Sequence, residues 1–399
     1  MKKILFSIFT ITVCALPMLA TNPVSPSMPS LTIAPDGRAA GMGDVGVATS
    51  SDINSQHWNP AKYAFMESKG GITANYTPWL TKLVDEINLA YLAGYYNMGD
   101  RVGAVSASFT YFSMGDVALV TNHGETFGNA KPNEWALDLA YSRKLHENLS
   151  MAVAMRFLFS DLTNGQNFEP GYSSEMHAAW TMAADVSLYY KQPISTPMGE
   201  SYFGLGFNLS NLGGKMSHDD VTQNFIPANM RLGVSYEIPF DNYNRLMATV
   251  ECNKLLVPTT YSKFGTDTLN GYPYFKTEDY SAISSVDGWW RSFCDAPGYT
   301  TETGKVVSPL MEEFQEVQWG VGLEYSYNRQ FFARLGYSHE HYWKGNRRYV
   351  TIGGGFNLSI FTFDFAYCIS SPSNPLDQTM RFSLGFDLAG MKNFVNNSK

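Results

Sequence analysis

The chain lacks any internal apolar run long enough for a spanning helix. Beyond its first twenty positions, no segment of the 399 residues approaches the ~20 uninterrupted apolar residues that a membrane-crossing helix needs. Its mean hydropathy is slightly negative, at −0.18. These two features exclude a helical membrane protein built from several spans.

Basic residues are also scarce. The chain carries 28 Lys and Arg residues against 36 Asp and Glu residues, which gives a formal net charge of −8. A nucleic-acid-binding protein needs a basic face to neutralise phosphates. The composition therefore argues against a nucleic acid as partner.

Cysteine is nearly absent, with only four in the chain. Cys14 lies in the N-terminal apolar segment, which leaves Cys252, Cys294 and Cys368 in the rest of the protein. An odd number in an exported protein leaves at least one thiol unpaired, and no pair has metal-ligand spacing. A Cys252–Cys294 or Cys294–Cys368 disulfide and three unpaired thiols remain the alternatives.

The N-terminus has the pattern of an export signal. Two lysines are followed by the apolar run 4–19 and by the small residue Ala20. This pattern predicts a secretory signal peptide over residues 1–20, cleaved after Ala20. The alternative is an N-terminal membrane anchor, but the apolar stretch is short and is interrupted by Pro17.

What the chain has in abundance is alternation of large apolar residues with small or polar ones. The last repeat places one set of residues on each face of a strand: Met380, Phe382, Leu384, Phe386 and Leu388 against Arg381, Ser383, Gly385 and Asp387. Because the second face is rich in Gly, Ala and Ser rather than Lys and Glu, it suits a narrow lumen. The fold class predicted is all-β, a transmembrane antiparallel β-barrel. The aromatic content of 15% matches the interfacial girdles of such barrels.

Alternation and turn residues predict fourteen strands. They lie near 70–76, 87–96, 101–112, 133–143, 148–160, 180–191, 201–210, 228–238, 244–253, 315–326, 330–340, 347–358, 361–369 and 379–389. Connections after even-numbered strands are short, and those after odd-numbered strands are mostly long. Outer-membrane barrels have short periplasmic turns and long outer loops. The pattern therefore predicts an even strand number with both termini in the periplasm.

Two regions fall outside the repeat. Residues 21–69 form a glycine-rich N-terminal segment that would sit in the periplasm or fold into the lumen of the barrel, which spans 70–399. The connection 254–314 is too long for an ordinary loop, and long ordered loops are usually functional. Its adjacent aromatics Trp289, Trp290 and Phe293 suggest a partner-contact surface on the extracellular side. The alternative is a loop that packs over the barrel mouth through its own aromatics.

Signals of catalysis are lacking. No G-x-S-x-G or other nucleophile motif occurs. His339 and His341 share one strand face and could contact a metal, but no third ligand is evident. We therefore predict a non-enzymatic protein with no cofactor and no metal. Charges on the lumenal face are expected to pair into a network that fills the barrel: Asp138, Arg156, Asp185, Arg231, Glu237, Arg334, Asp364 and Arg381.

One segment before the first strand carries a family resemblance. It contains the residues Pro35, Asp36, Arg38, Gly41, Met42, Gly43 and Asp44, followed by Trp58, Asn59, Pro60 and Ala61. This combination closely resembles the PorV (LptO) family of the Bacteroidetes type IX secretion system, within the FadL-like barrel superfamily. The resemblance covers nearly the whole chain, and sister PorQ-type proteins share parts of the motif.

The resemblance implies a fourteen-stranded FadL-like barrel in the outer membrane that shuttles proteins. Such proteins bind the C-terminal signal domain of cargo leaving a SprA-type translocon barrel. They deliver the cargo to a PorU-type sortase and attachment complex, which joins it to surface lipopolysaccharide. Two other functions stay open: a FadL-like channel for hydrophobic solutes, and a lipid A-modifying protein, for which no Ser/His pair at the outer rim is located.

Overall fold

The computed structural model describes residues 26–80, 86–120, 126–163, 176–219, 221–269, 271–301, 304–358, 360–371, 374 and 376–388. The predicted signal peptide therefore lies outside the described residues. None of the helices in these ranges is long and apolar enough to cross a membrane.

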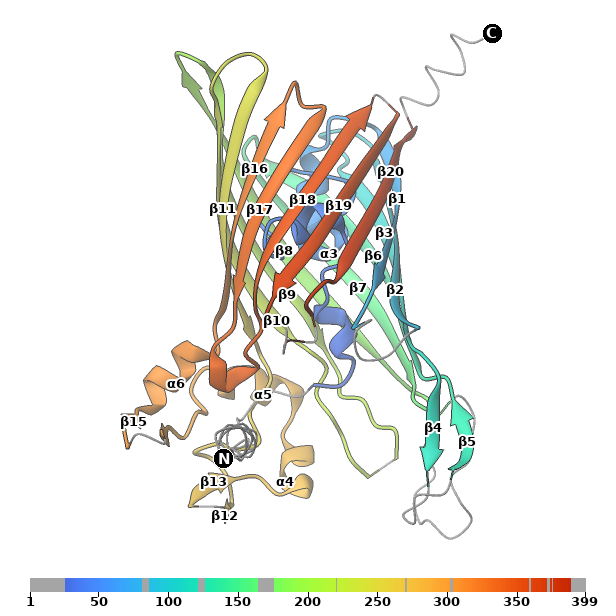
Figure 1. Cartoon of the computed structure of the whole chain (residues 1–399), viewed down its shortest axis with the longest axis vertical. Helices are drawn as coiled ribbons and strands as arrows, with labels where there is room; N and C mark the ends of the chain where they lie inside the picture. The colour runs from blue at the N-terminus through green and yellow to red at the C-terminus, as the bar shows by residue number, and fades with distance from the viewer. Residues whose placement is uncertain are drawn as a thin grey trace, which may run out of the picture.

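Antiparallel strands close into a single barrel (Figure 1). The wall comprises β1 (Gly70–Pro78), β2 (Ile87–Asn97), β3 (Ala104–Met114), β6 (Asn133–His146), β7 (Leu149–Asp161), β8 (Ala179–Thr196), β9 (Gly199–Gly213), β10 (Asn229–Pro239), β11 (Asn244–Leu255), β16 (Gln318–Tyr327), β17 (Phe331–His339), β18 (Arg348–Leu358), β19 (Phe361–Ser370) and β20 (Met380–Asp387). Neighbours follow chain order, and β20 pairs with β1 to complete the closure. The predicted fold class and all fourteen strands are confirmed.

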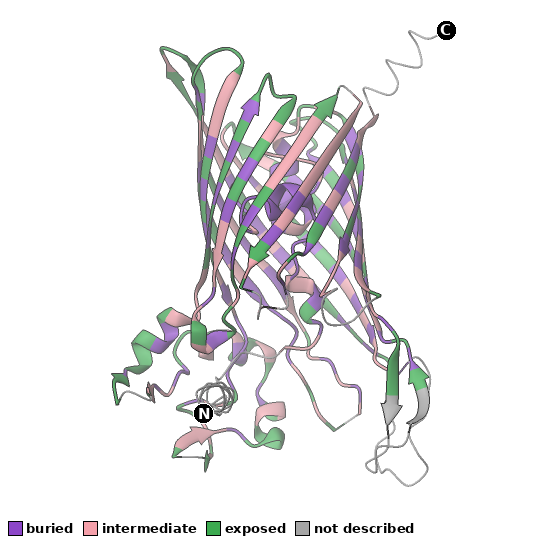
Figure 2. Cartoon of the chain, viewed as in Figure 1, coloured by how far each residue is buried: buried purple, intermediate pink, exposed green. Residues whose placement is uncertain are grey.

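The alternation along each strand decides which face points outward (Figure 2). On β6, Leu137 and Leu139 are exposed on the outer wall, whereas Asp138, which lies between them, and Ala140, which follows them, are buried in the lumen. A soluble protein would not leave a continuous belt of large apolar side chains exposed. On a barrel, this belt is the surface that meets lipid.

The two ends of the barrel differ. At one end, here called the turn end, strands are joined by short turns such as 197–198 and 328–330. At the other, the loop end, the connections are long. The turn predicted at 192–200 is shorter than expected, because β8 and β9 keep pairing as far as Thr196 and Gly199.

The loop end carries small elements of its own (Figure 1). They are β4 (Val117–Val120), β5 (Thr126–Ala130), β12 (Asp267–Leu269), β13 (Tyr272–Tyr274), α4 (Thr277–Ala282), α5 (Ser285–Arg291), β14 (Tyr299–Thr300), β15 (Val306–Val307), α6 (Pro309–Gln315) and η4 (Tyr342–Lys344). The strand predicted to begin at 315 begins at Gln318 instead. Ser308 caps the preceding helix α6 by accepting a hydrogen bond from the Met311 amide, and Pro309 suits a first helical turn.

Residues 26–66, here called the plug, lie inside the barrel (Figure 1). The plug contains η2 (Pro29–Thr32), α2 (Gly37–Ala40), α3 (Ser55–Trp58) and η3 (Pro60–Phe65). Its largest buried side chains, Trp58, Tyr63, Lys62 and Met42, are almost wholly inaccessible to solvent. The plug then leads directly into β1 at the turn end.

The three cysteines in the described ranges are all free thiols. Cys252 and Cys294 are exposed, and Cys368 is buried. Neither of the two disulfides considered from the sequence is therefore formed.

Candidate functional site

Asp36 organises the start of the plug. Its side chain caps helix α2 by accepting a hydrogen bond from the Ala39 amide at 2.9 Å. Its other oxygen accepts a bond from the indole Nε1 of Trp58 at 2.6 Å. These contacts join the two halves of the sequence motif, because Asp36 and Trp58 come from different plug helices. The guanidinium of Arg231 on β10 covers the Trp58 ring at 4.7 Å from its centre.

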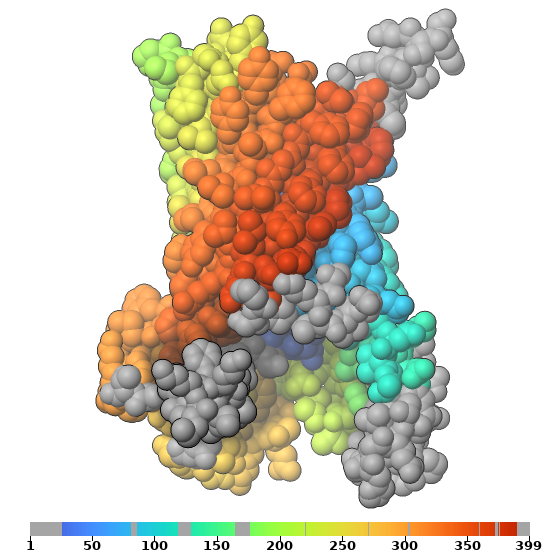
Figure 3. Space-filling model, in the orientation of Figure 1, coloured from blue at the N-terminus to red at the C-terminus, as the bar shows by residue number. Residues whose placement is uncertain are grey.

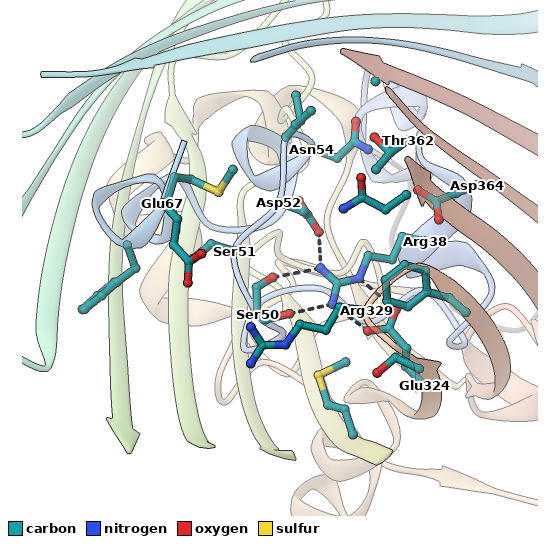
Figure 4. Close-up of a pocket in the computed structure, with 18 of the residues that line it drawn as sticks. Arg38, Ser50, Ser51, Asp52, Asn54, Glu67, Glu324, Arg329, Thr362 and Asp364 are labelled. Atoms are coloured by element: carbon teal, nitrogen blue, oxygen red, sulfur yellow. Dashed lines mark hydrogen bonds and ion pairs between the residues drawn. The ribbon is translucent and has the colours of Figure 1, made fainter. Parts of the chain in front are cut away.

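Arg38 fastens the plug to the wall (Figure 4). Its Nε and Nη2 donate to Glu324 of β16 at 3.0 and 2.8 Å. Its Nη1 donates to the carboxylate of Asp52 and to the carbonyl of Ser50, at 2.8 and 3.0 Å. A planar guanidinium is suited to such a fork of oxygens. Because Arg38 and Glu324 are buried and Asp52 is half-buried, the arrangement fixes helix α2 and the 50–52 segment of the plug against β16.

The glycines of the motif allow the plug backbone to touch the wall. Gly43 has a φ of +80°, a conformation that other residues rarely adopt. A Cβ added to Gly336 of β17 would lie only 2.0 Å from the Gly43 nitrogen. A Cβ on Gly353 of β18 would lie 2.9 Å from the Cα of Gly41. The glycines seen in mid-strand therefore serve close packing against the plug.

The remaining motif residues also hold the plug in the lumen. Asp44 accepts hydrogen bonds from Tyr349 Oη at 2.5 Å and from Arg381 Nη1 at 3.0 Å. Asn59 donates to the carbonyls of Val47 and Leu188 and accepts from the Ala61 amide. The other members of the motif are buried within the plug: Pro35, Met42, Pro60 and Ala61. All motif residues thus lie together in the lumen.

The lumenal charges pair as expected. Arg156 donates to Asp138 at 2.5 Å and forms an ion pair with Asp185 at 3.1 Å. Arg334 pairs with Glu324 and Asp364, both at 2.6 Å. The other pairs are Arg231–Glu251, Arg245–Glu237 and Arg381–Asp44. Glu324 and Glu251 were not predicted as plug partners, yet Glu324 accepts from Arg38 and Glu251 accepts from the Gly46 and Val47 amides at 2.8 and 2.9 Å. Glu324 is the lone acid on the glycine-rich inner face of β16, and that isolation was the available signal.

A cavity of about 570 Å³ lies between the plug and the turn end (Figure 4). Charged side chains from both the plug and the wall line it, including Arg38, Asp52, Glu67, Arg245, Arg329 and Asp364. Such a lining suits water or a polar ligand. It does not suit a hydrocarbon, because the buried charges would lose solvation without compensation.

The loop end presents exposed aromatic side chains around helix α5. Trp290 is 72% exposed, and Phe293 in the following turn is 41% exposed. Trp289 is only half-buried, and its carbonyl accepts a bond from Ser292. Phe264 is also exposed, and Arg291 lies over its ring. The three aromatics predicted as a contact surface therefore differ in exposure, since Trp290 and Phe293 are exposed and Trp289 is half-buried.

A cluster of carboxylates lies beneath helix α6. Asp295, Glu313 and Glu316 bring carboxylate oxygens within 4.8 Å of one another, a spacing that could hold a metal ion. The ammonium of Lys254 already lies at 3.3 Å from Glu313 and 2.7 Å from Glu316. His339 and His341 do not belong to this cluster. An amine therefore supplies the positive charge that a metal would otherwise bring.

Burial makes the carboxyl group of Asp295 an unusually weak acid. Desolvation, followed by the nearby charge of Glu316, raises the pKa of Asp295 to about 7. Its Oδ2 accepts a bond from the Thr259 amide, but its Oδ1 has no hydrogen-bond partner among the described residues. Near neutral pH this carboxyl group is therefore poised between its two protonation states.

Comparison with known proteins agrees with the fold and the motif. The family model for PorV, a type IX secretion system protein, matches residues 19–262. The Pseudomonas putida toluene transporter TodX superposes with a TM-score of 0.50 at 11% identity, over 92% of this chain and 98% of that one. A Pseudomonas aeruginosa FadL homologue gives a TM-score of 0.43 at 11% identity, over 89% and 99%. No curated protein sequence matches the chain.

Proposed function

Because the chain belongs to the PorV family of type IX secretion system proteins and forms a FadL-like outer-membrane barrel, we propose that it is a non-enzymatic carrier of secreted proteins. It binds the C-terminal signal domain of cargo that leaves a SprA-type translocon barrel. It then brings this cargo to a PorU-type sortase and attachment complex. The barrel acts as a lipid-embedded platform, and cargo does not pass through its lumen.

The plug that fills the lumen is the observation that carries this proposal. The plug is tied to the wall by buried ion pairs and by backbone contacts that leave no room for a side chain. Removing a plug held in this way would expose several buried charges at once, which is costly. A protein that conducts solutes needs a path, whereas a docking platform needs only its surfaces. The geometry therefore favours a role carried out at the ends of the barrel.

The orientation follows from connection lengths. We assign the turn end, where the described chain ends on β20, to the periplasm, and the loop end to the cell surface, as in other outer-membrane barrels. The expectation that both ends of the chain share one side is wrong for the described residues, because the Ser27 amide donates to the Phe225 carbonyl in the β9–β10 connection at the loop end. Cargo emerging from the translocon would then meet the elaborated loop end. On this end, Trp290 and Phe293 offer large aromatic contacts of the kind that anchor protein interfaces.

Deletion of the gene tests the carrier function. We expect signal-bearing cargo to accumulate in the periplasm or to be released without attachment to the surface. Normal secretion and attachment in the deletion strain would exclude the carrier function. Affinity capture from detergent-solubilised membranes, with signal-domain cargo and the translocon as the expected partners, provides an independent readout.

A double variant, Trp290→Ala with Phe293→Ala, tests the contact surface within that strain. We expect cargo capture to fall while the barrel still folds, as seen from its altered migration on a gel before and after boiling. Leu269→Ala on the β12–β13 hairpin is a matched control, because Leu269 is also an exposed apolar loop residue. If both variants capture cargo equally, the surface lies elsewhere, although the carrier function itself would stand.

A channel for hydrophobic solutes is the second candidate, since TodX is a toluene transporter and shares the fold. The charged cavity and the tied plug weigh against it. Liposomes containing the purified protein should not take up labelled fatty acid above the background of empty liposomes. Protein-dependent uptake would instead support the channel.

A further inference from the structure

Helix α6 has its polar and apolar faces reversed relative to a helix of a soluble protein. Leu310, Met311 and Phe314 are 68%, 54% and 65% exposed. Glu312 and Glu313, which lie on the opposite side of the helix, are only 3% and 9% exposed. A surface helix of a soluble domain normally buries its apolar side chains and exposes its charges. This exposed face is therefore available to an apolar surface outside the described residues.

The inversion is built into the packing of the loop end. Lys344 in the β17–β18 connection donates to Glu312 at 2.6 Å and to Glu316 at 2.9 Å. Lys254 at the end of β11 donates to Glu316 at 2.7 Å. Two lysines from the barrel rim thus hold the acidic face of α6 down. With that face fixed, rotation of α6 to bury its leucine and phenylalanine would break several buried ion pairs.

The exposed face continues an interface that the barrel already has. Only Glu316 and Val317 separate α6 from β16, whose Trp319 and Val321 are exposed on the outer wall. Trp319 stacks on His339 with ring centres 4.9 Å apart, at the position where barrels carry their interfacial aromatics. Figure 1 shows α6 to the side of the strand ends, and Figure 3 shows this region extending laterally beyond the wall.

We propose that helix α6 is a lipid-contacting element that rests its Leu310, Met311 and Phe314 on the outer leaflet. Acyl chains at the headgroup boundary are the occupant, because this face is continuous with the lipid-facing wall and its charges point away from it. An amphipathic helix in this position lies parallel to the interface. This contact anchors the 254–316 region at a fixed height relative to the membrane surface. Helix α5 would then be presented laterally to a partner protein in the same membrane.

Site-directed spin labelling tests this contact. Cys252 and Cys294 are first replaced by serine, Cys368 is left in place because it is buried, and a nitroxide is attached at Phe314→Cys or at Leu310→Cys. The intact barrel is reconstituted in phosphatidylethanolamine–phosphatidylglycerol vesicles. Collisions with oxygen, which partitions into lipid, are compared with collisions with a water-soluble nickel chelate. Glu278→Cys on α4 is the matched control, since Glu278 is exposed on another loop helix.

Labels at 310 and 314 should lose most of the chelate collisions seen at 278 and should gain oxygen collisions. The labels should lie about 5–10 Å below the headgroup boundary, the depth typical of interfacial helices. Chelate access equal to that at 278 would overturn the proposal. Protection that appears only after a captured membrane protein is added would also overturn it, and would assign the face to a protein partner. Using two label sites guards against misfolding of one variant.

Discussion

Arg38 of the plug and Glu324 of β16 meet in the lumen through two hydrogen bonds, at 3.0 and 2.8 Å. Arg334 approaches the same carboxylate from β17 at 2.6 Å, so Glu324 joins the plug to two neighbouring strands. A buried carboxylate held by two guanidinium groups is specific in geometry, because each planar fork fits it in one orientation. The pair therefore determines how the plug sits in the barrel.

Replacing Arg38 with Met should destabilise the barrel strongly. Removal of one partner of a buried ion pair typically costs about 3–5 kcal/mol, because a charge is left uncompensated. We expect the folded band to convert to the unfolded band at a lower temperature on gels of detergent-solubilised protein. Lys131→Met, which breaks the exposed Lys131–Asp116 pair, is the control and should leave the conversion temperature almost unchanged. Equal shifts for both variants would show that the plug contact contributes little.

Gly336→Ala should displace the plug, whereas Gly354→Ala should not. A Cβ at 336 would lie 2.0 Å from the Gly43 nitrogen, whereas a Cβ at 354 has its nearest neighbour at 3.7 Å. Overpacking of this kind typically costs about 1–3 kcal/mol. The measurement is single-channel conductance in planar bilayers. We expect channel openings from Gly336→Ala only. A Gly336→Ala barrel without channel openings would mean that the plug shifts while the lumen stays closed to ions.

Much of this architecture could be predicted from strand alternation alone. Side chains such as Leu137 and Leu139 must face lipid while Asp138 faces the lumen, and this local rule defines all the wall strands. The motif from Pro35 to Ala61 could be recognised as a unit, but its location in the lumen depends on contacts with residues hundreds of positions away. Arg38 and Glu324 have no local sequence relationship. The same holds for Gly43 and Gly336, whose contact follows only from closure of the barrel.

The loop end was the least predictable part. Trp289 and Trp290 are adjacent in sequence, yet helix α5 turns one toward the loop core and exposes the other. The charges beneath α6 were missed because Lys254 comes from the end of β11, Glu312 from helix α6 and Lys344 from the β17–β18 connection, far apart in sequence. Apolar residues in α6 would ordinarily predict a buried face. Only the barrel-rim lysines explain why the acidic face is buried instead.

Asn59→Asp should weaken the plug although the shape of the side chain is preserved. The Nδ2 group of Asn59 donates to the carbonyls of Val47 and Leu188, at 3.0 and 2.9 Å. A carboxylate has no donor for these carbonyls and would repel them in a buried site. We expect a loss of about 1–3 kcal/mol for each unsatisfied group, measured as a lower unfolding midpoint in detergent. An unchanged midpoint would indicate that water replaces the amide.

Asp295 should make the loop end less stable as the pH rises. Its pKa is raised to about 7 in the folded protein, against a usual value near 3.8. Between these values the folded loop retains a proton that the unfolded loop has released, so the stabilisation is complete below about pH 4 and is lost through pH 7. Hydrogen exchange of residues 290–316 should therefore be faster at pH 8 than at pH 5.5.

The variant Asp295→Asn identifies the group responsible for this pH response. It should remove most of the difference in exchange between the two pH values, after correction for the intrinsic exchange rate. A smaller residual slope is expected from Glu313, whose pKa burial also raises. Asp279→Asn on α4 is the control and should leave the response intact. Should Asp295→Asn keep the full response, another group would be titrating.

Labelling of the native cysteines tests the proposed orientation. Cys294 is exposed in the loop end, and Cys368 is buried against Tyr349 and Leu376 near the same end. A membrane-impermeant maleimide added to intact cells should therefore modify Cys294 and leave Cys368 unmodified until the barrel is unfolded. The Cys294→Ser variant should lose the signal, which separates it from reaction at the exposed Cys252. Modification of Cys294 only after the outer membrane is broken would place the loop end in the periplasm. That result would reverse the assignment on which the cargo-docking surface depends, because Trp290 and Phe293 would then face away from the cell surface.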